Sequence, residues 1–323
     1  MSPTRSTGRL TSRVLRKLWS RMLLLQASHP DILSNPGAYW ATGLFGGTRT
    51  LHLKDGTALL VSRDNLRMVT NILLLAYYGA RFSGPRSQRH LWRLSVEDGI
   101  IETPSGIQFT LESLEANIFA ETFIYDLHQV PGDLRGKVVV DVGAHVGDTA
   151  LYFAAQGATV YALEPDPMNF RRLLRNLELN PGLAQAVRPI EKAVGRDGKV
   201  VFRSGLRGGS GRFARQGTPT EVDSLSLTQL LSEFHIERPY LLKLDCKGSE
   251  FEIVRDPALA RFERLSIEYN TDLGVGTLDQ LVTALEAQGF PVIHTAKFGW
   301  GPEAESDMGL LHAERTSGVP SRS

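Results

Sequence analysis

Five residues near the middle of the chain have the types and spacing of a nucleotide-binding turn. Asp141 ends an apolar run, Gly143 and Gly147 follow it, Asp148 comes next, and Glu164 ends a second apolar run. The glycines let a ligand approach the backbone where no Cβ intrudes, and a carboxylate after the second run can accept both hydroxyls of a ribose. The pattern therefore predicts a site for a ligand that contains a ribose.

The spacing of the glycines indicates which kind of nucleotide fits. A dinucleotide fingerprint needs Gly-x-Gly-x-x-Gly to seat a pyrophosphate, whereas this chain has Asp-x-Gly-x-x-x-Gly from Asp141 to Gly147. Carboxylates at Asp141 and Asp148 would repel a pyrophosphate and would suit the ammonium of an amino acid. S-adenosylmethionine carries an ammonium and a ribose but no phosphate, so the spacing favours it over NAD. A Rossmann-like unit that binds nothing at this turn is the alternative.

A sheet of buried strands must hold these residues at one edge. Residues 138–140 and 159–163 are apolar runs typical of strands buried on both faces, and a helix is expected between them over residues 150–156. Ligands of open α/β sheets lie at the carboxyl ends of the strands, so Lys243 and Asp245 are expected at the same edge. Further strands are expected at residues 187–194, 240–244, 265–268, 291–294 and 308–312.

Six segments, in order along the chain, resemble those of FkbM-type methyltransferases: DVGAHVGDTALYF, EPDPMNFRRLLRNLELN, KAVGRDGKVVF, VDSLSL, LLKLDCKGSEFEIV and LSIEYN. The resemblance covers residues 119–312. It implies a Rossmann-like class I methyltransferase fold, with a seven-stranded, mostly parallel sheet that carries helices on both faces and ends in antiparallel closing strands. It also implies methyl transfer from S-adenosylmethionine, usually to a hydroxyl oxygen of a small molecule or sugar.

Two residues depart from the family pattern. His145 stands where the family commonly has Asn, at a loop position that tolerates the change. Lys247 stands where the family commonly has Glu in its Asp-x-Glu-Gly-x-Glu segment, so the role of that acid does not carry over.

The candidate catalytic residues follow the strand expected at 240–244. Methyl transfer is an in-line displacement, so an enzyme mainly aligns the acceptor oxygen and removes its proton. Asp245 is the first candidate for that carboxylate, with Lys243 beside it. Glu250 is either a second acid or a carboxylate favoured in the first turn of a helix. Cys246 is better explained as an apolar filler than as a nucleophile.

The candidate cofactor site extends beyond the turn. Similar proteins carry a Glu and a Tyr just before the first strand, here Glu121 and Tyr125, which would share a face of a helix; capping or packing explains them equally well. Residues 191–193 lie where similar proteins cradle the adenine. The complete set is Glu121, Tyr125, Asp141, Gly143, Ala144, His145, Gly147, Asp148, Glu164, Pro165 and Ala193.

No metal is expected. Asp245, Glu268 and Asn270 could imitate the oxygen ligands that metal-dependent hydroxyl methyltransferases place at strand ends. The family resembled is not generally metal-dependent.

The charge balance, cysteine count and apolar stretches of the chain limit the kinds of partner and location that we expect. The 323 residues include 36 Lys and Arg against 35 Asp and Glu, so no global field favours nucleic acid. Arg171, Arg172 and Arg175 are expected on a solvated helix face rather than against RNA. The single cysteine excludes an internal disulfide framework and favours a reducing, cytoplasmic location. No apolar stretch is long enough to span a bilayer.

Four segments are expected along the chain. Residues 1–35 form a basic amphipathic arm. Within it, residues 5–25 combine basic side chains with an apolar stripe from Leu10 to Leu25, which indicates a helix that packs on the protein, lies on a membrane surface, or acts as a transit peptide. Residues 36–118 form an α+β extension that caps the acceptor side, 119–314 the methyltransferase domain, and 315–323 a disordered tail.

Within these segments we expect a turn-rich connection at residues 35–47, a hairpin around Asp55-Gly56, and a helix from Asp64 that stops at Gly79. A second hairpin is expected around residues 104–106, and residues 204–218 are expected to form a mobile cationic loop.

Three functions fit the sequence. The leading one is O-methylation of a small molecule or glycan. The second is a non-catalytic, cofactor-binding scaffold of the same fold, and the third is an NAD-dependent oxidoreductase, which the glycine spacing disfavours. Binding of the cofactor separates the third from the others, and product formation separates the first from the second.

Overall fold

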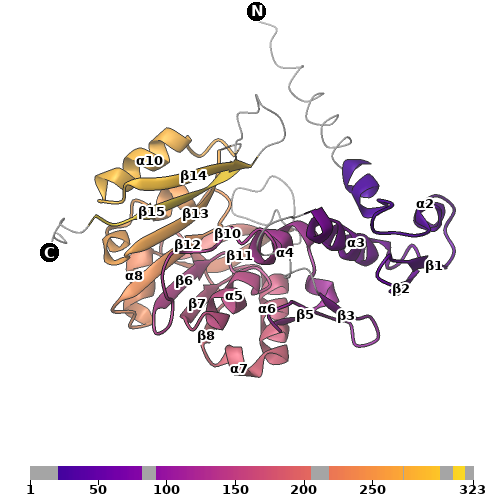
Figure 1. Cartoon of the computed structure of the whole chain (residues 1–323). Coiled ribbons are helices and arrows are strands. Elements are labelled where there is room, and N and C mark those ends of the chain that lie inside the picture. The colour runs from indigo at the N-terminus through magenta and orange to yellow at the C-terminus, as the bar shows by residue number, and fades with distance from the viewer. Residues whose placement is uncertain (1–20, 82–91, 205–217, 272, 299–307, 317–323) are drawn as a thin grey trace, which may run out of the picture. The chain divides into compact units, whose positions relative to one another are not determined.

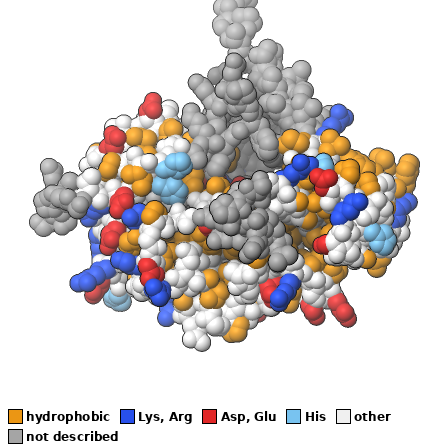
Figure 2. Space-filling model, viewed as in Figure 1, with side chains coloured by type: hydrophobic (Ala, Val, Ile, Leu, Met, Phe, Trp, Pro, Cys, Tyr) orange, Lys and Arg blue, Asp and Glu red, His pale blue; other side chains and the backbone are white. Residues whose placement is uncertain are grey.

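The structure, a computed structural model, describes the chain in five stretches: residues 21–81, 92–204, 218–271, 273–298 and 308–316 (Figure 1). The chain divides into two compact units, Met1–Gln129 and Val130–Ser323. Most of the expected basic arm, the loop at 205–217 and the tail from 317 lie outside the described residues. Acidic and basic side chains are interspersed over the face shown in Figure 2, in keeping with the near balance of charge.

The N-terminal unit contains short sheets and helices. Residues 21–27 are helical. The elements that follow are α2 (Pro36–Phe45), β1 (Arg49–His52), β2 (Ala58–Val61), α3 (Leu66–Arg81), β3 (Arg93–Ser95), β4 (Ile100–Glu102), β5 (Gln108–Thr110), η2 (Leu111–Ser113) and α4 (Ala116–Phe123). No helix within the described residues is long and apolar enough to cross a membrane.

Local sequence signals predicted this unit in part. The hairpin around Asp55-Gly56 is confirmed as antiparallel β1 and β2. The prediction of a turn-rich connection at residues 35–47 was wrong. Pro36, whose φ is fixed near the helical value, begins helix α2 there. The end of α3 was also wrong: Gly79 is buried inside the helix, which continues to Arg81. The expected second hairpin is a three-stranded antiparallel sheet, β3-β4-β5.

The C-terminal unit is built on a seven-stranded sheet in the order β14-β15-β13-β12-β6-β7-β8. All neighbouring pairs are parallel except the two that involve β15. The predicted mostly parallel sheet with antiparallel closing strands is therefore confirmed. Its strands are β6 (Val138–Val142), β7 (Thr159–Leu163), β8 (Val187–Ile190), β12 (Pro239–Leu244), β13 (Arg264–Asn270), β14 (Val292–Phe298) and β15 (Met308–Glu314).

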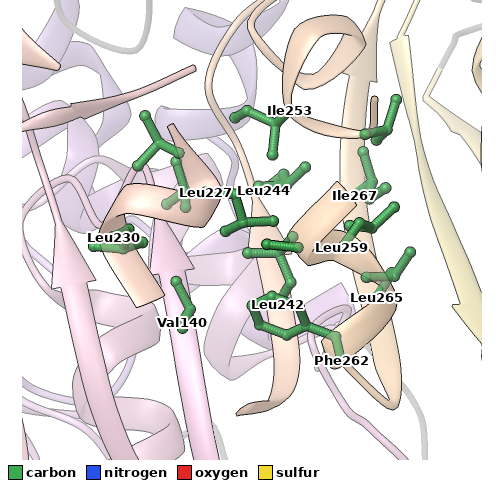
Figure 3. Close-up of a cluster of buried hydrophobic side chains, with 14 of the residues drawn as sticks. Val140, Leu227, Leu230, Leu242, Leu244, Ile253, Leu259, Phe262, Leu265 and Ile267 are labelled. Carbon is green, nitrogen blue, oxygen red and sulfur yellow. The ribbon is translucent and has the colours of Figure 1, made fainter. Parts of the chain in front are cut away.

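Burial explains why β6 and β12 are central. Every residue of β12 is buried, as is β6 after Val138, and such continuous apolar runs are typical of parallel strands covered on both faces. Figure 3 shows Val140, Leu242 and Leu244 of these strands packed with Leu230 in one cluster. The helices are α5 (Asp148–Ala155), α6 (Pro167–Leu179), α7 (Pro181–Ala184), α8 (Leu227–Glu233), α9 (Glu250–Ile253), η3 (Pro257–Arg261) and α10 (Leu278–Ala287).

The expected single strand over residues 187–194 was wrong. It is divided into β8, at the edge of the main sheet, and β9 (Ala193–Val194), which pairs with β11 (Thr218–Leu225). β11 also pairs with β10 (Gly198–Ser204), which makes a second sheet. Pro189 has no backbone N–H to donate, which suits the edge position of β8. Val194 pairs with Leu225 of β11, and both side chains are buried in the hydrophobic core.

Candidate functional site

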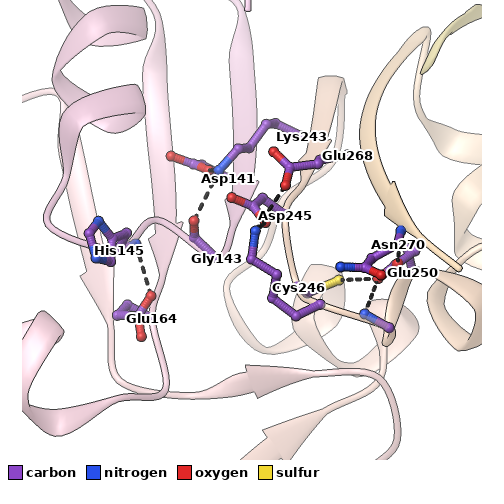
Figure 4. Close-up of polar contacts among 12 residues, drawn as sticks. Asp141, Gly143, His145, Glu164, Lys243, Asp245, Cys246, Glu250, Glu268 and Asn270 are labelled. Carbon is purple, nitrogen blue, oxygen red and sulfur yellow. Dashed lines mark hydrogen bonds and ion pairs between the residues drawn. The ribbon is translucent and has the colours of Figure 1, made fainter. Parts of the chain in front are cut away.

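Polar side chains meet where four neighbouring strands reach their carboxyl ends (Figure 4). Asp141 on β6 and Lys243 on β12 are partners in the strand register. Glu164 follows β7, Asp245 follows β12, and Glu268 lies near the end of β13. The sheet therefore gathers the predicted acids at one edge, the place where open α/β sheets bind their ligands.

The turn after β6 requires glycine at its first position. Gly143 has a φ of +80°, and a Cβ there would lie 1.9 Å from the backbone oxygen of Asp245. The N–H groups of Gly143 and Ala144 donate to the oxygen of Leu163, at 2.9 and 3.0 Å, which fixes the turn against the end of β7. Gly147, with a φ of +86°, then caps α5. The two predicted glycines thus shape the path of the loop across the sheet edge.

Asp141 and Lys243 form a buried ion pair beneath this turn. The Nζ of Lys243 lies 3.0 Å from Oδ1 of Asp141 and donates to the oxygen of Gly143 at 3.0 Å. Thr149 donates to Oδ2 of Asp141 at 2.7 Å. Burial works to lower the pKa of Lys243, but the carboxylates of Asp141, Asp245 and Asp148 outweigh it and hold the pKa above its ordinary value. Both oxygens of Asp141 are therefore engaged within the protein.

Glu164 is held by the backbone on both sides. Its Oε2 accepts the N–H of His145 and its Oε1 accepts the N–H of Asp166, both at 2.8 Å. Burial raises the pKa of Glu164 to about 8, against the opposing effect of these two donors. Because a carboxylate oxygen can accept two hydrogen bonds, each oxygen retains capacity for a ligand hydroxyl.

His145 lies in the turn with a φ of +49°. Burial lowers the pKa of its imidazole to about 4, and the positive charges of Lys243, Lys247 and Arg172 act in the same direction. The ring is therefore neutral at neutral pH. Arg172, expected on an exposed face, is buried on α6, so that expectation was wrong.

Asp245, Lys247 and Glu268 form a second charged group across the ends of β12 and β13. The Nζ of Lys247 lies 2.8 Å from Oδ1 of Asp245 and 2.9 Å from Oε1 of Glu268. The Asp245 side chain is 27% exposed and the Glu268 side chain 11%. Within the described residues, no group of three or more His, Cys, Asp or Glu side chains is arranged to hold a metal ion.

Glu250 joins the loop after β12 to the end of β13. It is fully buried, its Oε2 accepts the N–H of Gly248 at 2.6 Å, and its Oε1 accepts the N–H of Asn270 at 3.1 Å. The thiol of Cys246 contacts Oε2 at 3.6 Å, and burial holds the pKa of that thiol well above its ordinary value. This geometry gives Glu250 a structural task and keeps Cys246 a neutral thiol.

Replacement of Glu250 with alanine is expected to lower the free energy of unfolding by about 1–3 kcal/mol, because two buried N–H groups lose their acceptor. Urea denaturation followed by circular dichroism measures it. Glu286→Ala, on the exposed face of α10, is the matched control and should change little. A loss for Glu250→Ala no larger than for the control would contradict this role.

The remaining predicted residues are placed differently. Glu121 and Tyr125 belong to the N-terminal unit, and their contact with a cofactor stays a prediction. Their expected common helix face was wrong, because α4 ends at Phe123, before Tyr125. Ala193 is half-buried on β9, and Asp148 is buried in the first turn of α5.

Sequence reasoning missed two contributors to the site. Thr149 holds Asp141, but a threonine in the first turn of a helix gives no signal by itself. Lys247 was noted as a departure, yet its contacts with Asp245 and Glu268 depend on a loop conformation that spacing does not reveal.

Part of the chain is similar to known methyltransferases. Residues 141–292 match the family described as the methyltransferase FkbM domain. The hexuronic acid methyltransferase AglP of Haloferax volcanii is 27% identical over 210 residues, 64% of this chain and 75% of AglP. Methyltransferase 1 of Beauveria bassiana is 26% identical over 230 residues, 61% of this chain and 89% of that protein. The solved METTL16 MTase domain aligns with a TM-score of 0.44 and 15% identity, over 86% of this chain and 88% of the domain.

The family match runs from Asp141, near the end of β6, to Val292, the first residue of β14, and it includes the turn, Glu164, Asp245 and Glu268. This match favours methyl transfer over the NAD-dependent oxidoreductase that the sequence left as an alternative. The match of residues 141–292 to the methyltransferase FkbM domain, together with the class I, Rossmann-like sheet, identifies the protein as an S-adenosylmethionine-dependent methyltransferase.

Proposed function

We propose that this enzyme methylates a hydroxyl oxygen of a small molecule or sugar, with Asp245 orienting the acceptor and taking its proton. The observation that carries the proposal is the exposure of Asp245. Its side chain is 27% exposed, whereas those of Asp141 and Glu268 are 0% and 11% exposed. Among the candidate acids described at this edge, Asp245 is thus the carboxylate that an acceptor can reach most readily.

The chemistry assigned to the protein is alignment and proton removal. S-adenosylmethionine, when bound, supplies the methyl group on a sulfonium. Asp245 accepts a hydrogen bond from the acceptor hydroxyl, which directs the oxygen lone pair along the line of displacement. A carboxylate is a weak base for an alcohol, so the proton moves to Asp245 late, as the oxygen forms its new bond. Lys243 acts as a positioning group, because it is buried beneath the turn.

We further propose that Glu164 accepts the ribose hydroxyls of the cofactor, with the turn from Asp141 to Asp148 around the rest of it. The positive φ at Gly143 and Gly147 and the spare acceptor capacity of Glu164 support this fit. Because both oxygens of Asp141 are engaged within the protein, Asp141 acts mainly by holding Lys243 and the turn.

Replacement of Glu164 with glutamine is expected to weaken binding of S-adenosylhomocysteine by about 10- to 100-fold, the loss of one or two charge-assisted hydrogen bonds. Its pKa of about 8 adds a pH effect. In the free protein this raised pKa contributes stability at low pH that is lost as pH rises through about 8. Ligand hydroxyls favour the ionised carboxylate, so binding at pH 7 should release a proton and strengthen towards pH 8.

Calorimetry in buffers of different ionisation enthalpy measures the released proton. The Glu164→Gln protein should show no buffer dependence. Equal affinity in the two proteins, or buffer-independent enthalpy in the wild type, would contradict the assignment of Glu164.

Incubation with S-adenosylmethionine labelled on its methyl group, and with a panel of acceptors, tests the proposed function. The panel should contain neutral sugars, hexuronic acids, aliphatic alcohols and phenols, since the relative AglP is named for a hexuronic acid. We expect label on a hydroxyl oxygen of one class. Label confined to carboxylates, nitrogen or sulfur would contradict the proposal.

A further inference from the structure

Lys247 lies at the place in the site where two carboxylates converge. Its Nζ is 2.8 Å from Asp245, which follows β12, and 2.9 Å from Glu268, near the end of the adjacent strand β13. Its side chain is 23% exposed. Figure 4 shows the side chains of Asp245 and Glu268 lying close together. Paired carboxylates at strand ends are suitable oxygen ligands for a divalent cation, and here an ammonium occupies the space between them.

The backbone holds this lysine in an unusual conformation. Lys247 has a φ of +49°, in the left-handed region that a lysine rarely adopts, and Gly248 follows with a φ of +105°. The N–H of Gly248 donates to the buried Glu250, which fixes the turn. Backbone strain of this kind persists only where the surrounding structure enforces it, and it often marks a functional residue.

The ammonium of Lys247 has hydrogen-bonding capacity to spare. A lysine ammonium has three donors, and two of them point to Asp245 and Glu268. No residue that the structure describes supplies a third acceptor. Burial opposes the charge, but the two carboxylates outweigh it and hold the pKa of Lys247 well above its ordinary value. The group is therefore a fixed cation with one donor left for a ligand oxygen.

We propose that the ammonium of Lys247 is a built-in cation that binds the acceptor hydroxyl oxygen beside Asp245, where a divalent metal ion could otherwise bind. This inference rests on the proposed function. The hydroxyl oxygen accepts an N–H of Lys247 and forms its bond to the methyl carbon, while the carbon–sulfur bond breaks and its electron pair stays on sulfur. The hydroxyl proton goes to Asp245, and Lys247 keeps its protons. Its charge lowers the pKa of the bound hydroxyl, which favours transfer of the hydroxyl proton to Asp245.

The charge of the group indicates the class of acceptor. With both carboxylates ionised, Asp245, Lys247 and Glu268 together carry one net negative charge. A carboxylate acceptor would be repelled, whereas a neutral hydroxyl can accept from Lys247 and donate to Asp245. The structure therefore favours a neutral alcohol or sugar hydroxyl as the methylated group.

A test that needs neither cofactor nor acceptor uses Mn²⁺ titration followed by electron paramagnetic resonance. In Lys247→Ala the two carboxylates lose their counter-ion, so this protein should bind one Mn²⁺ that the wild type does not. Lys247→Gly, which also removes the strain of the positive φ, should bind one Mn²⁺ as well. The double variant Lys247→Ala, Glu268→Gln should not bind Mn²⁺ at this place. Lys199→Ala, in an exposed pair with Glu221, is the matched control and should gain no site. No Mn²⁺ site in either Lys247 variant would overturn the built-in cation.

A second readout uses the acceptor found in the screen. Lys247→Ala should lower kcat by about 10- to 100-fold, leave S-adenosylhomocysteine affinity within about twofold, and recover part of kcat with Mn²⁺. A merely structural lysine would lower the melting temperature without changing kcat per folded protein, and that result would overturn the acceptor role. Failure to find any acceptor would count against the proposed function, and the Mn²⁺ titration would still decide whether Lys247 is a built-in cation.

Discussion

Replacement of Asp245 with alanine is expected to lower kcat for methyl transfer by about 10²- to 10⁴-fold, the usual contribution of a positioned general base. Asp245 follows β12 at the sheet edge and is the most exposed of the candidate acids described there. The substitution leaves Glu164 and the glycine turn intact, so S-adenosylhomocysteine affinity should change by less than about twofold. Steady-state kinetics with the acceptor found in the screen, together with calorimetry, separates the two effects.

Asp245→Asn distinguishes orientation from proton removal. Asparagine can still accept a hydrogen bond from the acceptor, but it cannot take the proton at neutral pH. Its kcat should lie between those of the wild type and Asp245→Ala, and Glu286→Ala should match the wild type. An Asp245→Ala protein that keeps more than about one tenth of the wild-type kcat would rule out the assigned role.

Replacement of Asp141 with alanine is expected to lower the free energy of unfolding by about 3–5 kcal/mol, because it leaves the buried ammonium of Lys243 without its counter-ion. The side chains of Asp141 and Lys243 are 0% and 4% exposed, and their charged atoms lie 3.0 Å apart. Thr149 also loses the acceptor of its hydroxyl. Urea denaturation monitored by circular dichroism measures the change.

The double variant Asp141→Leu, Lys243→Met keeps this prediction measurable if the single variant does not fold. Removing both charges takes away the unpaired ammonium, so most of the lost stability should return. Glu221→Ala is the control, because its pair with Lys199 is about 60% exposed at both ends and should contribute little to stability. Similar losses for Asp141→Ala and Glu221→Ala would disprove a special role for the buried pair.

Much of the sheet could be predicted because its signals are local. Val139 and Val140 of the run before Asp141 are buried, as is every residue of β12, and continuous apolar runs identify such strands without knowledge of their neighbours. The prediction of one strand at residues 187–194 was wrong, because the division between β8 and β9 depends on which distant strand each half pairs with. Helix α2 was not predicted, because the residues that suggested a turn there also favour the start of a helix when proline takes the first position.

The sequence predicted which residue types lie at the candidate site, but it did not predict which side chains form ion pairs and hydrogen bonds with one another. The acids at the strand ends follow from strand direction, since parallel strands bring their carboxyl ends to one edge. That Asp141 is engaged with Lys243 and Thr149, and that Lys247 bridges Asp245 and Glu268, depends on side-chain geometry. The left-handed backbone at Lys247 gives no sequence signal, because lysine is not a residue that favours it.

A crystal structure of the protein with S-adenosylhomocysteine tests the central claim most directly, because it shows where the cofactor binds. We expect the ribose hydroxyls within hydrogen-bonding distance of the Glu164 carboxylate, and the sulfur facing the side of the site that holds Asp245 and Lys247. A ligand bound away from the carboxyl ends of β6, β7 and β12, with Glu164 contacted only by the N–H groups of His145 and Asp166, would contradict the account.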